Sequence, residues 1–184
     1  YMYRTTVRRA KERLDAQGFG LNNFEKIFND EMFYGCDNDT NMSRIGYMNC
    51  ILHNIKNPQI TMDSLLEHEN AKEYMEKFDI VLQNPPFSGS LVEEATNAKL
   101  LAITKTKKTE LLFVALMLSL MKVGGRGMSI VPDGVLFGGD KAHMSLRKEL
   151  IDNQKLIGVV SMPDGLFSAP TKKGSASKGA NVKT

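Results

Sequence analysis

The spacing of apolar residues along the chain predicts helices that alternate with short strands. Helical spacing is found at 1–16, about 22–28, about 41–53, 109 to about 123, and 142–153. Short apolar runs predict strands at 32–36, 59–62, 78–82, 128–131 and 156–161. The run at 78–82 shows no polar alternation, so we expect this strand to be buried on both faces, as in a parallel sheet. The alternation of strands and helices indicates an α/β domain with a mainly parallel sheet.

The residues that follow the predicted strands are the first candidates for function, because open parallel sheets bind ligands at the carboxyl ends of their strands. These residues are Asp37, Asp63, the loop 84–87, and two Pro-Asp-Gly tripeptides at 132–134 and 163–165. Pro, Asp and Gly in this order suit a tight turn, and we interpret both tripeptides as turns without chemistry. "GGRG" at 124–127 is interpreted as the stop signal of the preceding helix.

Composition restricts the class of protein. The chain has 184 residues, of which 42% are hydrophobic and 24% charged, as in an ordinary globular domain. Its longest apolar stretch, 111–121, is far shorter than the roughly 20 residues of a membrane span. Cys36 and Cys50 are isolated, and the three histidines share no ligand spacing. We therefore expect reduced thiols, no bound metal, no membrane contact and a cytoplasmic location.

The charge is distributed unevenly, although the net charge is only +3. Four of the 24 basic side chains lie in 171–184, which leaves 20 basic against 21 acidic side chains elsewhere. This basic, Gly- and Ser-rich tail is interpreted as a solvated flexible segment. Lys105, Lys107 and Lys108 precede the most apolar helix, where they are either nucleic-acid-binding residues that contact DNA phosphates or an ordinary solvated charge run.

The stretch "DIVLQNPPFSGS" at 79–90 carries the most specific chemistry. Asn84 precedes a proline and is therefore held in an extended conformation. Pro85 and Pro86 lack an N–H group, so nearby carbonyls can point outward as acceptors beside the Asn84 amide oxygen. Phe87 adds a flat apolar face. Two fixed acceptors beside an aromatic ring suit a planar base that bears an NH2 group; a rigid loop with a capping Asn is the alternative.

Two carboxylates strengthen the first interpretation. Asp37 follows an earlier strand, where an acid can accept hydrogen bonds from both ribose hydroxyls of a nucleoside cofactor. Asp63 follows the next strand and could accept from the amine of the adenine in that cofactor. A single Asp after a strand is usually a turn or cap residue. Two of them followed by the Asn84–Phe87 loop, on successive strands, is a rarer arrangement.

Five stretches resemble the modification subunit of type I restriction-modification systems: "FYGCDNDTNMSRIGYMNCILHNI", "MDSL", "FDIVLQNPPFSGS", "GGRGMSIVPDGVLFG" and "LIGVVSMPDGLF". The family consists of adenine-N6 DNA methyltransferases with a Rossmann-like fold that use S-adenosylmethionine. The resemblance implies that Asp37 holds the cofactor ribose and that Asp63 lies near its adenine. It also implies that Asn84 and Pro85, with Pro86, bind the amine of a flipped target adenine on which Phe87 stacks.

The same resemblance implies partners and boundaries. The partners would be DNA and the specificity and restriction subunits of the same system, in a hetero-oligomer. A catalytic domain is expected at 1–167 and a basic tail at 168–184. No Gly-rich loop follows a first strand in this sequence, so we expect a partial domain that lacks the first and last strands of the family fold.

Alternatives remain open at this stage. The same acceptors would suit the amide of a protein glutamine or the amine of an RNA guanine. A catalytically inert subunit, whose apolar helices bind a DNA-reading partner, is a different class of function. A dehydrogenase is disfavoured because no GxGxxG motif follows a strand.

Overall fold

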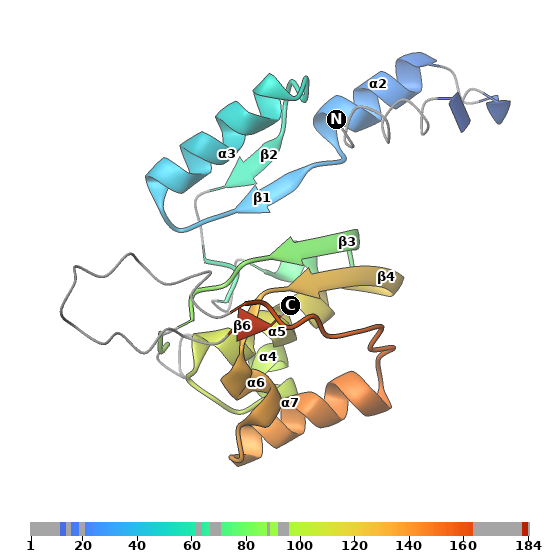
Figure 1. Ribbon diagram of the computed structural model, residues 1–184. Coiled ribbons are helices and arrows are strands. Elements are labelled where there is room, and N and C mark those ends of the chain that lie inside the picture. The colour runs from blue at the N-terminus through green and yellow to red at the C-terminus, as the bar shows by residue number, and fades with distance from the viewer. Residues whose placement is uncertain are drawn as a thin grey trace. The chain divides into compact units, whose positions relative to one another are not determined.

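Figure 1 shows the computed structural model of the chain, which divides into two compact units, Tyr1–Ser64 and Leu65–Thr184. The structure describes residues 12–13, 16–18, 21–61, 64–66, 71–87, 89–91, 96–163 and 182–183. The predicted helix at 1–16 therefore lies mostly outside the described residues. The expected boundary between a catalytic domain and a tail at 167/168 also stays a prediction, because only Val182–Lys183 of that tail are described.

The first unit contains a short parallel sheet with a helix against it (Figure 1). Its elements in chain order are α2 (Leu21–Asp30), β1 (Tyr34–Cys36), α3 (Thr40–Leu52) and β2 (Gln59–Thr61). β1 and β2 pair in parallel, with Gly35 opposite Ile60. The predicted helix at 41–53 and the predicted strands at 32–36 and 59–62 are confirmed to within two residues at each end. α3 starts where Asp39 accepts hydrogen bonds from the N–H groups of Asn41 and Met42.

A small aromatic cluster packs the first unit. Phe24 and Phe28 lie one turn apart on α2 and are buried together with Ile55. Phe33 packs its ring against that of Phe28 in an edge-on arrangement, with 5.2 Å between the ring centroids. The 54–57 turn is held to α2 by Asn29, whose side-chain oxygen accepts the N–H of residue 56. This cluster therefore joins α2 to the chain on both sides of α3.

The second unit is built on a longer parallel strand pair with helices on one side (Figure 1). Its elements are η1 (Lys72–Tyr74), β3 (Phe78–Gln83), α4 (Ala98–Ile103), α5 (Thr109–Leu120), β4 (Met121–Ser129), β5 (Val131–Pro132), α6 (Asp133–Phe137), α7 (Lys141–Asp152) and β6 (Val182–Lys183). β3 and β4 are parallel, whereas β5 and β6 are antiparallel. The connection from β3 through α5 to β4 is the strand–helix–strand unit that the sequence pattern predicts.

α5 forms the centre of this unit. Its residues are apolar around the whole circumference, and eight of them are buried, among them Leu111, Leu112 and Ala115 at 0% exposure. Leu100 from α4 and Leu146 from α7 are buried in the same cluster. A helix that is apolar on every face must be covered on every face. The β3–β4 sheet, α4 and α7 supply that cover.

The prediction that the strand at 78–82 is buried on both faces is wrong for the described residues. Val81 packs on the core, but Ile80 and Leu82 are 65% and 71% exposed. Helices cover only one face of the β3–β4 sheet in this part of the chain (Figure 1). Asp79 interrupts this apolar run and is exposed, and an apolar run by itself cannot show which elements cover a strand.

The helix at 109–123 ends earlier than predicted, at Leu120. Its last carbonyls, on Ser119 and Leu120, accept the N–H groups of Glu76 and Lys77, which satisfies a helix end without a glycine. The "GGRG" stretch is therefore part of β4 and not a helix stop. Gly124 adopts a φ of +82°, where β4 takes extra residues between its pairings with Phe78 and Ile80.

Two further predictions differ from the structure. Residues 156–161 form no regular strand in the described chain, although they are exposed and mostly apolar. Asp133 does not lie in a simple turn, because it begins the short helix α6 immediately after Pro132. Pro at the N-cap has a fixed φ that is compatible with the start of a helix, which turn statistics alone do not reveal.

Candidate functional site

The Asn84–Phe87 loop leaves the carboxyl end of β3, as the sequence predicts. Asn84 and Pro86 are exposed, Pro85 is buried and Phe87 is half-buried. Within the described part of the chain, neither the Asn84 side chain nor the carbonyls of Asn84 and Pro85 take part in a hydrogen bond. The loop thus has hydrogen-bond acceptors available next to the half-buried ring of Phe87. Recognition of an amine on a planar base requires this arrangement.

Gln83 fixes the start of this loop. Its Nε2 donates to the Phe113 carbonyl in α5 at 2.9 Å and to Ser129 Oγ in β4, also at 2.9 Å. Its backbone carbonyl accepts the N–H of Ile130 at 3.2 Å. The last residue of β3 is therefore joined to two other elements. Sequence reasoning did not identify Gln83 as a site residue, although a polar side chain at the end of an apolar strand was a usable signal.

The far end of the loop is held by backbone pairing. Leu91 N–H donates to the Lys107 carbonyl at 2.9 Å, and Thr109 N–H donates to the Gly89 carbonyl at 3.1 Å. Ser90 and Lys108 form an isolated antiparallel bridge between these two bonds. A Cβ atom on Gly89 would lie 2.8 Å from Thr109 Oγ1, so the close approach to α5 requires glycine here.

Asp37 lies at the carboxyl end of β1, where the sequence places it. It is half-buried, its N–H donates to the Thr61 carbonyl of β2, and its Oδ1 accepts the N–H of Asp39 at 2.9 Å. No hydrogen bond to Oδ2 is found among the described residues. This carboxylate therefore has an acceptor available for hydroxyl groups, which fits the ribose of a nucleoside cofactor. Asp63 lies outside the described residues.

The three candidate DNA-binding lysines lie between α4 and α5, and all three side chains are exposed. Lys108 Nζ forms an ion pair with Asp140 Oδ2 at 2.9 Å. Asp140 caps α7 by accepting the His143 N–H and also accepts the Nδ1–H of the buried His143 ring. The hydrogen bonds from His143 and Lys108 hold the pKa of Asp140 well below its usual range. Lys108 thus already has a structural role.

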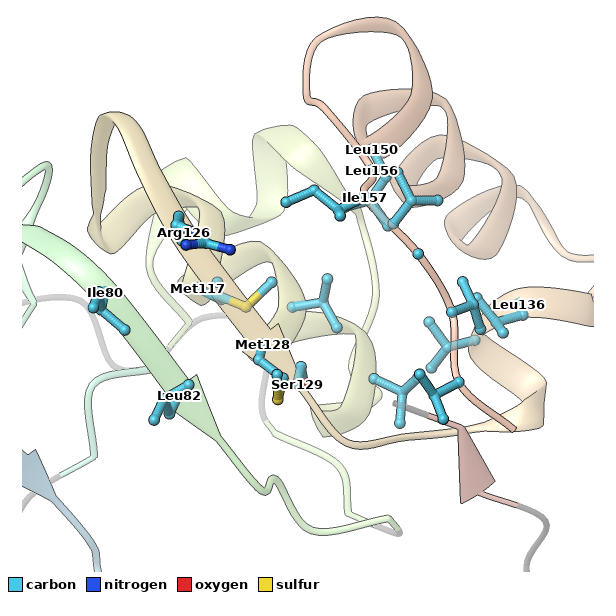
Figure 2. A pocket seen from close by; sticks show the side chains of 17 residues that line it. Ile80, Leu82, Met117, Arg126, Met128, Ser129, Leu136, Leu150, Leu156 and Ile157 are labelled. Carbon is cyan, nitrogen blue, oxygen red and sulfur yellow. The ribbon is translucent and has the colours of Figure 1, made fainter. Parts of the chain in front are cut away.

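An apolar cavity of about 480 Å³ adjoins the exposed face of β3 and β4 (Figure 2). Ile80 and Leu82 line it from β3, Met128 from β4, and Leu156 and Ile157 from the segment after α7. Arg126 is the one charged side chain among the lining residues. Asn84–Phe87 do not contribute to the lining. The cavity therefore has neither the acceptors nor the aromatic ring of the candidate amine-binding loop.

Among the described residues, no group of three or more His, Cys, Asp or Glu side chains is arranged to hold a metal ion. No helix in the described ranges is long and apolar enough to cross a membrane.

Asp37 belongs to the first unit and the Asn84–Phe87 loop to the second. Each lies at the strand end at which a parallel sheet binds its ligands.

Comparison with known proteins identifies relatives over most of the chain. The methylase subunit of the type I restriction enzyme StySPI from Salmonella potsdam is 29% identical over 160 residues, which are 84% of this chain and 28% of that protein. The EcoEI methylase subunit from Escherichia coli is 32% identical over 124 residues, which are 67% of this chain and 25% of that protein. The chain spans about a quarter of the length of these curated relatives.

The fold also has a solved counterpart. A modification subunit assigned to a type I restriction enzyme from Vibrio vulnificus YJ016 superposes with a TM-score of 0.70 at 24% identity, over 95% of this chain and 36% of that chain. This likeness shows a mixed α/β fold of the Rossmann-like type. The family described as N-6 DNA Methylase matches residues 14–175. This chain belongs to the N-6 DNA methylase family, which transfers methyl groups and thus requires a methyl donor.

Proposed function

We propose that this chain is part of a DNA methyltransferase that methylates the N6 amine of adenine, within a type I restriction-modification complex. The observation that carries the proposal is the Asn84–Phe87 loop at the carboxyl end of β3. Its acceptors are not engaged among the described residues, and an aromatic ring follows them. The family match and the names of the relatives support adenine in DNA as the substrate.

The loop would act on a base that has left the duplex, because the N6 amine is otherwise paired and stacked. The Asn84 side-chain oxygen and the Pro85 carbonyl would accept the two hydrogens of the amine. Phe87 would stack on the base, a contact worth about 1–3 kcal/mol in other proteins that bind single bases. Acceptance of both hydrogens reduces the delocalisation of the nitrogen lone pair into the ring, so the amine becomes a better nucleophile. The chain would contribute positioning and electrostatics more than acid–base chemistry.

S-adenosylmethionine is the methyl donor that we propose, and it supplies an electrophilic methyl group when bound. Asp37 would hold its ribose through the carboxylate oxygen that has no partner among the described residues. Asp63 would accept from the amine of its adenine. Removal of the Asp37 carboxylate should therefore weaken cofactor binding, whereas changes in the Asn84–Phe87 loop should leave it intact.

The relatives' names also suggest the partners. Methylase subunits of type I restriction enzymes bear names that imply further subunits, and we propose a specificity subunit and a restriction subunit for this protein. Lys105 and Lys107 are exposed and would contact DNA phosphates. The bacterial hosts of these relatives keep their DNA in the cytoplasm, where we place this protein as well.

Replacement of Asn84 by Ala tests the proposed site. The Asn84→Ala variant of the full-length protein, assembled with its partners, should lose at least about a hundredfold in kcat because the amine loses one of its positioned acceptors. The measurement is transfer of a labelled methyl group to duplex DNA, followed by mapping of the modified base.

The matched control is Asn153→Ala, which removes an exposed amide that bonds only to Glu149 among the described residues. This variant should methylate DNA like the parent protein. Cofactor binding by Asn84→Ala, measured by calorimetry, should stay within about twofold because the proposed cofactor contacts lie elsewhere. Methylation by Asn84→Ala at the parental rate, or the absence of N6-methyladenine from the products of the parent, would refute the proposal.

A further inference from the structure

We propose that Gln83 is a positioning residue for the Asn84–Phe87 loop: its side chain joins β3 to α5 and β4 and thereby sets the orientation of the neighbouring Asn84. This inference rests on the proposed function of the loop. Gln83 touches neither substrate nor cofactor in this scheme. It acts through the backbone that it shares with Asn84.

The hydrogen bonds of Gln83 determine the orientation of its amide. The Phe113 carbonyl can only accept, so the group 2.9 Å from it must be the NH2 of Gln83. The second hydrogen of the same NH2 reaches Ser129 Oγ, also at 2.9 Å, and the Ser129 hydroxyl in turn points to the Ile130 carbonyl. Both donors of the amide are thus used. A side chain held at two points by partners on different elements cannot rotate without losing a bond.

The alternation of β3 explains why this clamp acts on Asn84. Val81 packs on the core beside α5, Gln83 donates to α5, and Pro85 is buried. Leu82 and Asn84 occupy the alternate positions and are exposed. In an extended strand successive side chains point to opposite faces, and the proline after Asn84 keeps that residue extended. When Gln83 is fixed on the inner face, Asn84 is fixed on the outer face.

Positioning of this kind has a characteristic kinetic signature. A displacement of a reacting group by about 1 Å can cost about a hundredfold in rate, while binding of a cofactor held elsewhere does not change. Loss of the clamp should therefore lower kcat and leave the KM for S-adenosylmethionine almost unchanged. A residue that contributes only to stability would reduce the amount of folded enzyme without a change in kcat per folded molecule.

The experiment uses the full-length protein assembled with its partner subunits. Gln83→Met preserves the length of the side chain and removes both donors, so kcat per cofactor-binding site should fall about tenfold or more. Ser129→Ala removes one partner and should give a smaller loss, whereas Ser129→Thr retains the hydroxyl and should restore the rate. Gln83→Glu should also be slow, and its rate relative to the parent should rise as the pH falls, because a protonated carboxyl regains one donor.

Gln59→Met is the matched control. Gln59 is also a glutamine in a parallel strand, but its Nε2 donates only to the Asn57 carbonyl two residues away. This variant should keep the kcat of the parent protein. A parental kcat in Gln83→Met, or an equal loss in Gln83→Met and Gln59→Met, would overturn the inference.

A second measurement separates the clamp from the proposed function. Hydrogen–deuterium exchange of peptides that cover residues 80–87 should be faster in Gln83→Met than in the parent or in Gln59→Met. If the parent methylates no adenine, the proposed function fails, and the exchange data still decide the role of Gln83. Unchanged exchange would show that Gln83 does not hold the loop.

Discussion

Thr109 begins α5 with a buried hydroxyl that has no hydrogen-bond partner among the described residues. An unsatisfied buried hydroxyl costs about 1–3 kcal/mol, whereas a methyl group of similar size costs nothing at such a position. Thr109→Val should therefore raise the free energy of unfolding by about 1 kcal/mol. Denaturant unfolding of the parent and the variant would measure the difference.

The comparison with Thr109→Ser gives this prediction its control. Thr109→Ser keeps the unsatisfied hydroxyl and loses a buried methyl group, so it should destabilise the protein. If Thr109→Val were the less stable of the two variants, the hydroxyl would have a partner that the described residues do not include.

For single residues, the sequence predicted the position at a strand end better than it predicted the partners of a side chain. Asp37 and Asn84 occupy the strand ends at which the apolar runs placed them, because strand ends depend on local pattern. The partners of Gln83 lie 30 and 46 residues further along the chain. Contacts over that separation depend on the packing of α5 against β3, which no local pattern contains.

Asp140 caps α7 and pairs with Lys108 at the start of α5, and this pairing should make the stability of the protein depend on pH. Hydrogen bonds from His143 and Lys108 lower the pKa of Asp140 in the folded protein below the value of about 3.9 for an unfolded aspartate. A depressed pKa stabilises the folded state above the unfolded pKa, and this stabilisation is lost as the pH falls through the folded pKa. Asp140→Asn should therefore be less stable than the parent near pH 7, and the difference should shrink below about pH 4.

Asp79→Asn is the control for this effect. Asp79 also pairs with a lysine, Lys122, at 2.8 Å, but its side chain is 79% exposed. Ion pairs on the surface contribute little to stability because water screens them. Unfolding midpoints measured from pH 7 to pH 3 should thus separate the two variants, and equal pH profiles would contradict the assigned role of Asp140.

Elements were predicted best where propensity and tertiary contacts agree. The helices at α3 and α7 have good N-caps, Asp39 and Asp140, next to a regular apolar spacing. The end of α5 was missed because its last carbonyls are satisfied by Glu76 and Lys77, which precede β3 in the chain. The prediction of a strand at 156–161 was wrong because a strand requires continuous pairing, and in the described chain only Ser161 of this segment takes part in a β-bridge.

α5 supplies most of the buried residues in the core of the second unit. Replacement of a single buried leucine in that helix should therefore lower the stability of the protein. Leu112 is fully buried in the main apolar cluster. Leu112→Ala should lower the free energy of unfolding by about 3 kcal/mol, the sum of lost transfer energy and a residual cavity. Leu52→Ala in α3 removes a side chain that is 78% exposed and should change stability by less than about 0.5 kcal/mol.

The alternation of strands and helices in the sequence predicted the α/β class of the fold. It did not predict which strands pair or which sheet faces are covered. Parallel pairing within each of the two units follows the prediction. The exposed faces at Ile80 and Leu82 and the antiparallel pairing of β6 with β5 do not follow from apolar runs. Sheet order and coverage depend on which segments meet, and that information is spread over the whole chain.

The clamp at Gln83 also has a consequence for the order of folding. Its partner in β4 is 46 residues away, so the bond can form only after the intervening chain has closed into a loop. α5 lies within that interval, and its backbone bonds are local. We therefore expect α5 to form early and the β3–β4 pairing, with the shape of the Asn84–Phe87 loop, to form late. During synthesis, the Asn84–Phe87 loop would reach its binding conformation only after β4, the strand that follows α5, has left the ribosome.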